Sequence, residues 1–171
     1  ILNYKGEAIE GNAFAVDIPT EGKKLQKAMK NPELQKALKD GKLLSETIKD
    51  DKALADIKFP VFVADIDGAT KYILPIYGAG LWGPIWGYIS LDDNKDTVYG
   101  TYFSHASETP GLGAEIATDH FQNEFVGKKT LENGAITLGV VKNGKVEKPD
   151  YQVDGISGGT ITSVGVDAML K

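Results

Sequence analysis

Cysteine is absent from this chain of 171 residues, and histidine occurs only twice. Without thiols the protein can form no disulfide, no iron–sulfur cluster and no thiolate zinc site, and it has no thiol nucleophile. The two histidines, His105 and His120, do not have the spacing of a metal motif, and we expect both to be ordinary surface or hydrogen-bonded residues. Any electron chemistry in this protein therefore depends on a bound organic cofactor.

Long apolar runs and clusters of basic residues are also missing. No segment approaches the roughly 20 apolar residues that a membrane-spanning helix needs, and no signal peptide is visible. The formal net charge of −5 argues against nucleic-acid binding. The chain opens with Ile1 rather than Met, so we expect the natural N-terminus, with any anchor or targeting segment, to lie upstream.

The length and a hydrophobic content of 42% predict one domain over residues 1–171, with a closed core. Residues 21–56 are rich in Lys, Leu, Ala and Glu and are expected to be mainly helical. A helix is expected over 31–41, with Asn31 as its N-cap, Pro32 in the first helical position and Gly41 at its end. Residues 45–58 are a second helical candidate.

Strand signals dominate from Phe59 onward. The runs 59–67 and 70–78 predict a hairpin around the turn at 67–69, and 85–91 and 97–105 predict a strand pair across the acidic loop 92–96, whose aspartates we expect to be solvated. Residues 119–127 indicate a helix, and Asn143-Gly144 is the strongest local hairpin signal. Helices before strands, and strands joined by tight turns, predict an α+β fold: a mainly antiparallel sheet with β-hairpins, packed with several short helices.

The segment "DGISGGTITS" at 154–163 places three glycines and four hydroxyl side chains in front of an expected helix. Gly158 and Gly159 can expose consecutive backbone N–H groups, and Thr160, Thr162 or Ser163 can begin the helix. A helix N-terminus after such a turn is a ready anion site, because its first N–H groups are unpaired. On the residues alone, a phosphate site and a plain helix cap are about equally supported.

Two further segments are weaker when taken singly. "GAGLWGPIWGYISL" at 78–91 is either a glycine-rich loop whose Trp82 and Trp86 pack in the core, or an apolar wall for a planar ring. "SETPGLGAEI" at 107–116 offers side-chain oxygens from Glu108 and Thr109 in a tight turn, and as an isolated stretch it would also serve as a simple link between a strand and a helix.

Together these segments resemble the FMN-binding domain family, in the family's order. "DGISGGT" followed by "ITS" resembles the family's flavinylation motif, whose final Thr carries FMN through a phosphoester bond; here that residue is Thr160. "ETPGLGAEI" is similar to the family's second signature, which contacts the flavin. "KYILPIYGAGLWGPIWGYISL" resembles a stretch typical of the C subunit of the Na⁺-translocating NADH:quinone oxidoreductase. One departure is Gly159, where the family usually has Ala.

The resemblance implies covalent FMN on Thr160 and no catalytic acid, base or metal ligand. Between the two threonines of the turn, we expect Thr160 to carry the flavin and Thr162 to cap the helix. The implied cofactor-binding residues come from all three segments: Ser157, Gly158, Gly159 and Thr162; Glu108, Thr109, Gly111, Leu112 and Gly113; and Leu81 and Trp82.

The resemblance also implies an electron-carrier subunit that relays electrons inside a membrane respiratory NADH:quinone oxidoreductase coupled to Na⁺ export. The expected partners are the other membrane subunits of that complex and a separate FMN transferase that forms the bond. The implied location is the outer side of the bacterial cytoplasmic membrane, reached through an N-terminal transmembrane helix upstream of this chain. The isolated domain is expected to have no independent turnover.

Three alternatives stay open. The G subunit of the related ferredoxin-linked electron-transport complex shares the motif, although the "GLW…GYISL" segment favours the C subunit. A non-redox extracytoplasmic binding domain that has lost the cofactor is suggested by Gly159. A flavin reductase that uses free FMN has less support, because the sequence contains no dinucleotide-binding fingerprint.

Overall fold

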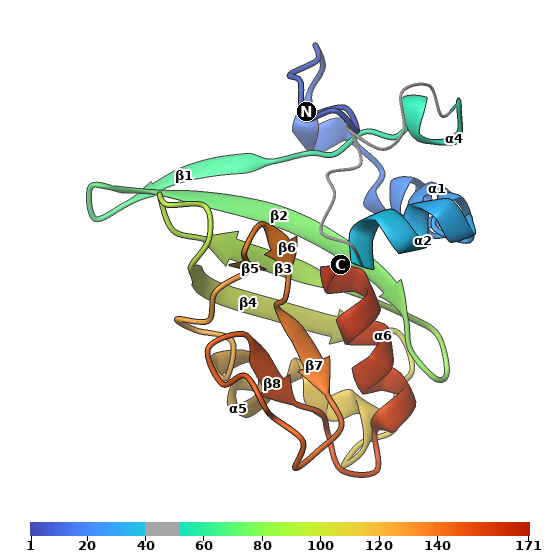
Figure 1. Ribbon diagram of the computed structural model, residues 1–171, viewed down its shortest axis with the longest axis vertical. Coiled ribbons are helices and arrows are strands. Elements are labelled where there is room, and N and C mark those ends of the chain that lie inside the picture. The colour runs from blue at the N-terminus through green and yellow to red at the C-terminus, as the bar shows by residue number, and fades with distance from the viewer. Residues whose placement is uncertain (40–51) are drawn as a thin grey trace.

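The computed structural model describes residues 1–39 and 52–171 (Figure 1). Short helices form the N-terminal part: η1 (Ala13–Ala15), α1 (Ile18–Ala28), α2 (Pro32–Lys39) and α4 (Lys52–Ala55). As predicted, Pro32 is the first residue of α2, and Asn31 Oδ1 accepts a hydrogen bond from Glu33 N at 3.0 Å. The expected end at Gly41 and the part 45–51 of the second helical candidate lie outside the described residues.

A four-stranded antiparallel sheet in the order β1-β2-β3-β4 forms the centre of the molecule (Figure 1). Its strands are β1 (Phe62–Ile66), β2 (Ala69–Ala79), β3 (Pro84–Leu91) and β4 (Val98–His105). Asp67 and Gly68 join β1 to β2 with φ angles of 53° and 79°, the left-handed pair that a type I′ hairpin turn requires. The first hairpin, the β3–β4 pair and the α+β fold are thus confirmed.

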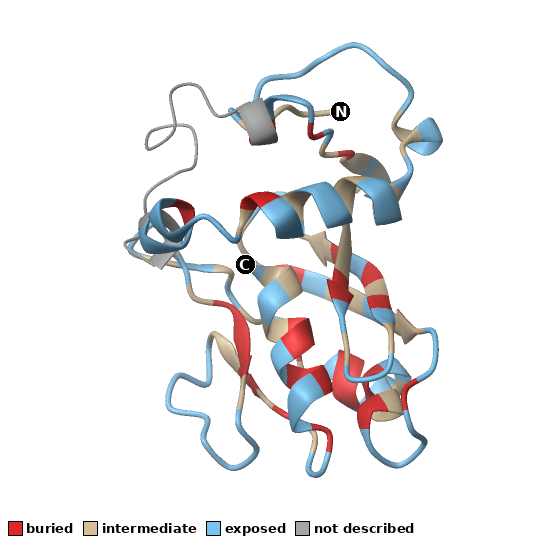
Figure 2. Cartoon of the chain, turned by 90° about the vertical axis from the view of Figure 1, so that its right-hand side faces the viewer, coloured by how far each residue is buried: buried red, intermediate tan, exposed pale blue. Residues whose placement is uncertain are grey.

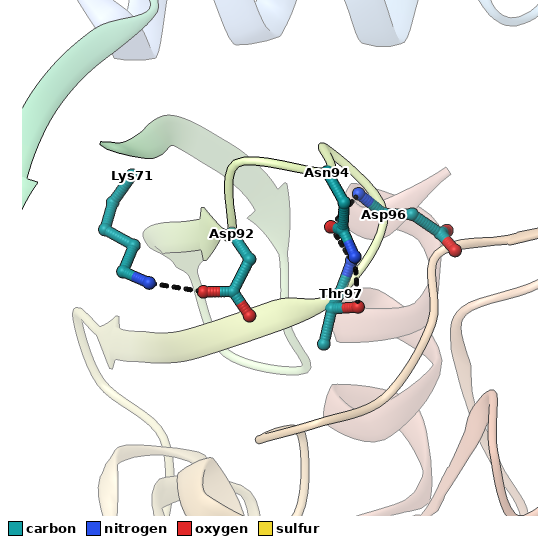
Figure 3. A network of polar contacts seen from close by, with 5 residues as sticks. All are labelled: Lys71, Asp92, Asn94, Asp96 and Thr97. Carbon is teal, nitrogen blue, oxygen red and sulfur yellow. Dashed lines mark hydrogen bonds and ion pairs between the residues drawn. The ribbon is translucent and has the colours of Figure 1, made fainter. Parts of the chain in front are cut away.

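The acidic loop 92–96 is held by contacts within the protein, so the expectation of solvated aspartates was wrong for two of them. Lys71 Nζ donates to Asp92 Oδ1 at 2.5 Å (Figure 3), and this bond raises the pKa of Lys71 although burial acts to lower it. Asp96 accepts hydrogen bonds from Leu131 N and from Thr130 N and Oγ1. Burial acts to raise the pKa of Asp96, but these bonds outweigh it, and its pKa lies below the ordinary value.

The main core covers one face of the sheet. Its side chains come from β3 and β4, from α5 (Asp119–Asn123), β7 (Gly139–Val141) and β8 (Gln152–Asp154), and from α6 (Thr160–Leu170). The rings of Phe103, Phe121 and Phe125 pack with centroids 5.2–5.9 Å apart. Figure 2 shows buried residues gathered on the sheet and along α6. A second, smaller cluster (Ala28, Leu34, Leu54 and Ile57) lies among the N-terminal helices.

Helix α6 lies close against the end of β2, and this contact positions the site described below. A Cβ placed on Gly165 would lie 2.1 Å from the carbonyl oxygen of Ala79, so only glycine permits this approach. Thr162, Ser163 and Val166 face the protein interior from the same helix. The N-terminus of α6 is therefore fixed near the loop that follows β2.

The hairpin predicted around Asn143-Gly144 does not form. The turn is present, with φ of 73° at Gly144, but β7 before it pairs in parallel with β8 beyond it. Asn143 Nδ2 donates to Gly155 O at 2.9 Å and Gly144 N donates to Asp154 Oδ1 at 2.8 Å. These bonds hold the turn against β8, so the segment after it does not fold back on β7.

A second Asn-Gly pair forms the hairpin that sequence reasoning missed. Asn133 and Gly134, with φ angles of 52° and 83°, join β5 (Leu131–Glu132) to β6 (Ala135–Ile136). The helix expected over 119–127 is shorter than predicted, because α5 ends at Asn123 and continues only as turns. Thr118 caps it by accepting a hydrogen bond from Phe121 N.

Candidate functional site

The hydroxyl-rich turn leads directly into α6. The helix begins at Thr160, the residue before it is Gly159, and no side chain among the described residues caps this end. Gly158 has φ of +76°, a conformation that L side chains rarely adopt. The first N–H groups of an uncapped helix have no intrahelical acceptor and lie at the positive end of the helix dipole, so this end of α6 suits an anion.

The four hydroxyl side chains of the turn fall into two pairs. Ser157 and Thr160 are exposed, whereas Thr162 and Ser163 are buried. Ser163 Oγ donates to Gly159 O and accepts from Ile156 N, both at 2.9 Å. A reagent from solvent can therefore reach the hydroxyls of Ser157 and Thr160, whereas those of Thr162 and Ser163 are inaccessible.

Thr162 does not cap the helix, which corrects the sequence-based expectation. It is the third residue of α6 and only 1% exposed. Its Oγ1 donates to Glu108 Oε2 at 2.5 Å. The hydroxyl therefore connects the helix to a turn 54 residues earlier in the chain.

The 107–113 turn presents one residue to solvent and buries the one before it. Leu112 N donates to Thr109 O at 3.1 Å across Pro110 and Gly111, and Gly111 has φ of +75°; this is the pattern of a type II turn. Thr109 is exposed. Glu108 is only 5% exposed, and its backbone N–H donates to His105 Nδ1 at 3.1 Å.

The loop between β2 and β3 is joined to the same turn. Trp82 N donates to Glu108 Oε1 at 2.8 Å, and Ser107 Oγ donates to Trp82 O at 3.1 Å. The side chains of Leu81 and Trp82 are 48% and 65% exposed. The interpretation of Trp82 as a core residue was therefore wrong. Trp86 is half-buried, and its side chain lies on the other face of β3 from the buried Ile85.

Three segments that are distant in the sequence meet at one carboxylate. A Cβ on Gly80 would lie 2.5 Å from Glu108 Oε1, and a Cβ on Gly113 would lie 2.4 Å from both Glu108 Oε2 and Thr162 Oγ1. Leu112 lies against Gly158, since a Cβ there would be 2.6 Å from Leu112 Cδ2. The structure thus brings the β2–β3 loop, the 107–113 turn and the start of α6 together.

Residues 80–171, more than half of the chain, match the family model described as the FMN-binding domain. The chain belongs to the FMN-binding domain family. All three segments of the site lie inside the matched range. The family model does not reach residues 1–79, so the assignment of 1–171 to a single FMN-binding domain stays a prediction.

The chain is similar to the C subunits of Na⁺-translocating NADH-quinone reductases. It is 41% identical over 103 residues to the C subunit of Haemophilus ducreyi, covering 60% of this chain and 40% of that protein. It is 33% identical over 166 residues to the C subunit of Vibrio vulnificus, covering 94% of this chain and 59% of that protein. The chain thus spans about half the length of these curated relatives.

The fold is also similar to that of a solved C-subunit structure. The crystal structure of the C subunit of the Na⁺-translocating NADH-quinone reductase from Parabacteroides distasonis superposes with a TM-score of 0.74 and 46% sequence identity. The superposition covers 99% of this chain and 69% of that chain. The similarity therefore includes the N-terminal helices as well as the part that the family model matches.

Sequence reasoning missed two exposed apolar residues beside the hydroxyl-rich turn of this FMN-binding domain. Ile161 and Val164 are 56% and 61% exposed on the first turns of α6. Leu81, Trp82 and Leu112 are exposed on the two segments that meet this helix. The signal was present in "TITSVGV", because Ile161 and Val164 are three apart and share a helix face, opposite the buried Thr162 and Val166.

A cleft of about 870 Å³ lies away from these segments, between α1, β2 and the C-terminal half of α6. In residues 1–39 and 52–171 there is no group of three or more acidic or histidine side chains placed to hold a metal ion. Within the same ranges, no helix has both the length and the apolar character needed to cross a membrane.

Proposed function

We propose that this chain is the FMN-carrying domain of an electron-transfer subunit, with FMN attached through a phosphoester to Thr160. The observation that carries the proposal is the position of Thr160: it is exposed, and it begins an uncapped helix where the three segments meet. When bound, FMN supplies the electron chemistry. The residues of this chain bind and orient the cofactor.

The phosphate end of the cofactor fits the start of α6. The exposed Thr160 hydroxyl provides the attachment atom, and the N–H groups of the first helical turn provide donors for the remaining phosphate oxygens. Gly158 is exposed in this turn, and Ser157 adds a second exposed hydroxyl. This donor set matches an anion and includes no side-chain cation in the turn itself.

The ring end of the cofactor has apolar and polar neighbours available. We assign Leu81, Trp82 and Leu112 to cover part of the isoalloxazine ring, because their side chains are exposed next to the attachment turn. Thr109, also exposed, offers a hydroxyl to the ring's polar edge. A ring on an open surface is bound weakly by contacts alone, so a covalent bond suits this position.

Gly159 has a local steric explanation that does not require loss of the cofactor. A Cβ at this position would lie 3.0 Å from Ile156 Cγ2 and 3.3 Å from Gly113 N. Both contacts are tighter than usual, so an alanine here would require a small shift of Ile156. This observation weakens the alternative of a cofactor-free binding domain, which rested mainly on Gly159.

For the whole protein we propose the role named by its relatives: the C subunit of a Na⁺-translocating NADH-quinone reductase, with the other membrane subunits as partners. A separate FMN transferase would form the bond. We further propose a position on the outer side of the bacterial cytoplasmic membrane, held by a transmembrane helix outside this sequence. Support comes from the similarity to the Vibrio vulnificus protein over 94% of the chain.

Co-expression with an FMN transferase tests the attachment. Intact mass should increase by one FMN less one water, as a phosphoester requires, and peptide mapping should locate the adduct on Thr160. Thr160→Ala should abolish the adduct, whereas Thr160→Ser, which keeps a hydroxyl, should retain some of it. Ser157→Ala is the matched control, because it removes the other exposed hydroxyl of the turn. An adduct on Ser157 or Thr162, or one that survives Thr160→Ala, would contradict the proposal.

A further inference from the structure

The carboxylate of Glu108 is the polar centre of the site, but it does not face the solvent. It is 5% exposed. One oxygen accepts from Trp82 N at 2.8 Å and the other accepts from Thr162 Oγ1 at 2.5 Å. Each bond joins the 107–113 turn to one of the other two segments.

Within residues 1–39 and 52–171, no cationic side chain forms an ion pair with this carboxylate. A buried carboxylate without a cation is costly unless hydrogen bonds replace the water that it loses. Here two neutral donors do so, and Gly80 and Gly113 leave no Cβ where the carboxylate lies. An apolar residue would fill the same space at lower cost, so the geometry points to a role other than packing.

We propose that Glu108 is a positioning residue for flavin attachment, and this inference rests on the function proposed above. By engaging the Thr162 hydroxyl, Glu108 keeps that side chain turned inward and fixes the first turn of α6. Thr160, two residues earlier and exposed, is then the threonine presented to the transferase. By holding Trp82 N, the same carboxylate keeps the Leu81-Trp82 loop beside the attachment turn.

The attachment step shows why the orientation of the turn matters. The Thr160 hydroxyl loses its proton to a base of the transferase, and its oxygen forms a bond to the phosphorus of a flavin nucleotide activated as a phosphoanhydride. The phosphoanhydride P–O bond to the leaving nucleotide breaks. Glu108 takes no part in these bond changes. It acts through the position of the acceptor, and a small misplacement of a reacting atom is enough to slow such a reaction by about a hundredfold.

Glu108→Gln tests this role with little change of volume. The amide oxygen can still accept from Trp82 N–H, but the NH₂ group then faces Thr162 Oγ1, whose hydroxyl can no longer donate to residue 108. We expect the initial rate of FMN incorporation, followed by intact mass with purified transferase, to fall at least about tenfold. Glu108→Leu removes both acceptors, so exchange of the Trp82 amide hydrogen in the unloaded protein should become at least about tenfold faster in that variant.

A remote variant separates positioning from general loss of stability. Ile57→Ala removes a buried side chain from the N-terminal cluster, away from the site, and should destabilise the fold while leaving the incorporation rate and the Trp82 amide nearly unchanged. Double-mutant analysis with Thr162→Val gives a second test. If Glu108 acts through Thr162, the two substitutions together should slow incorporation by less than the product of their separate effects.

The outcomes are separable. Wild-type protein labelled on Thr160 with an unchanged rate in Glu108→Gln would overturn the role of Glu108 and leave the proposed function standing. An equal fall in the Ile57→Ala control, or fully independent effects of Glu108→Gln and Thr162→Val, would also overturn it. Wild-type protein that stays unlabelled by an active transferase would overturn the proposed function, and the inference with it.

Discussion

Replacing Thr162 by valine should destabilise the protein far more than the same replacement at Thr160. Valine has the shape of threonine but lacks the hydroxyl, so Thr162→Val removes one hydrogen bond and leaves Glu108 Oε2 without its donor in the interior. Hydrogen bonds to charged groups contribute about 1.5–3 kcal/mol to stability. Thr160 is exposed, and a surface change of this kind costs within about 0.5 kcal/mol.

The two variants form a matched pair, because both place valine in the first turn of α6 and carry the same penalty for helix propensity. Urea unfolding followed by circular dichroism should give a midpoint lower by roughly 1 M for Thr162→Val, and thermal unfolding a midpoint lower by about 4–8 °C. Thr162→Ser keeps the hydroxyl and should recover most of the difference, apart from about 0.8 kcal/mol for the lost methyl group. Equal losses at the two positions would refute the assignment of this hydrogen bond.

Four other predictions concern the flavin site and the acidic loop. Gly158→Ala should cost more stability and more flavin incorporation than Gly111→Ala, since both have positive φ but only the first meets a neighbouring side chain; equal costs would contradict the crowding. Thr109→Val should change the flavin spectrum or reduction potential of loaded protein with the fold intact, and an unchanged spectrum and potential would place its hydroxyl away from the ring. Trp82 emission, measured in a Trp86→Phe background, should be quenched by bound FMN; equal emission from loaded and unloaded protein would place it elsewhere. Asp96 has a lowered pKa, so its stabilisation is present above the ordinary value of about 4 and is lost as pH falls through the folded value. Asp96→Asn should therefore reduce the dependence of unfolding free energy on pH in this acid range. A pH curve parallel to that of the wild type would contradict the stabilising role of the Asp96 carboxylate.

Local sequence was sufficient to predict a turn where the conformational preference of two adjacent residues decides the structure. Asp67-Gly68 forms the predicted hairpin because the pair tolerates positive φ and the strands on either side of it pair directly with each other. Asn143-Gly144 carries the same kind of signal and fails. Hydrogen bonds that Asn143 and Gly144 donate to Gly155 and Asp154 hold that turn against β8 instead, and the dipeptide alone does not predict these acceptors.

In the site, too, some features were predictable from local sequence and others depend on tertiary contacts. The glycines and hydroxyls of 154–163 are local features, so the chain's own residue pattern was enough to predict a helix that starts in this turn, and α6 does begin at Thr160. Which hydroxyls stay accessible depends on burial. Thr162 turns inward because Glu108, 54 residues away, accepts its hydrogen bond, and the Trp82 loop lies beside the turn because the same carboxylate holds its backbone. These contacts come from the packing of α6 against the sheet, since side chains so distant in the chain meet only when those elements are in place.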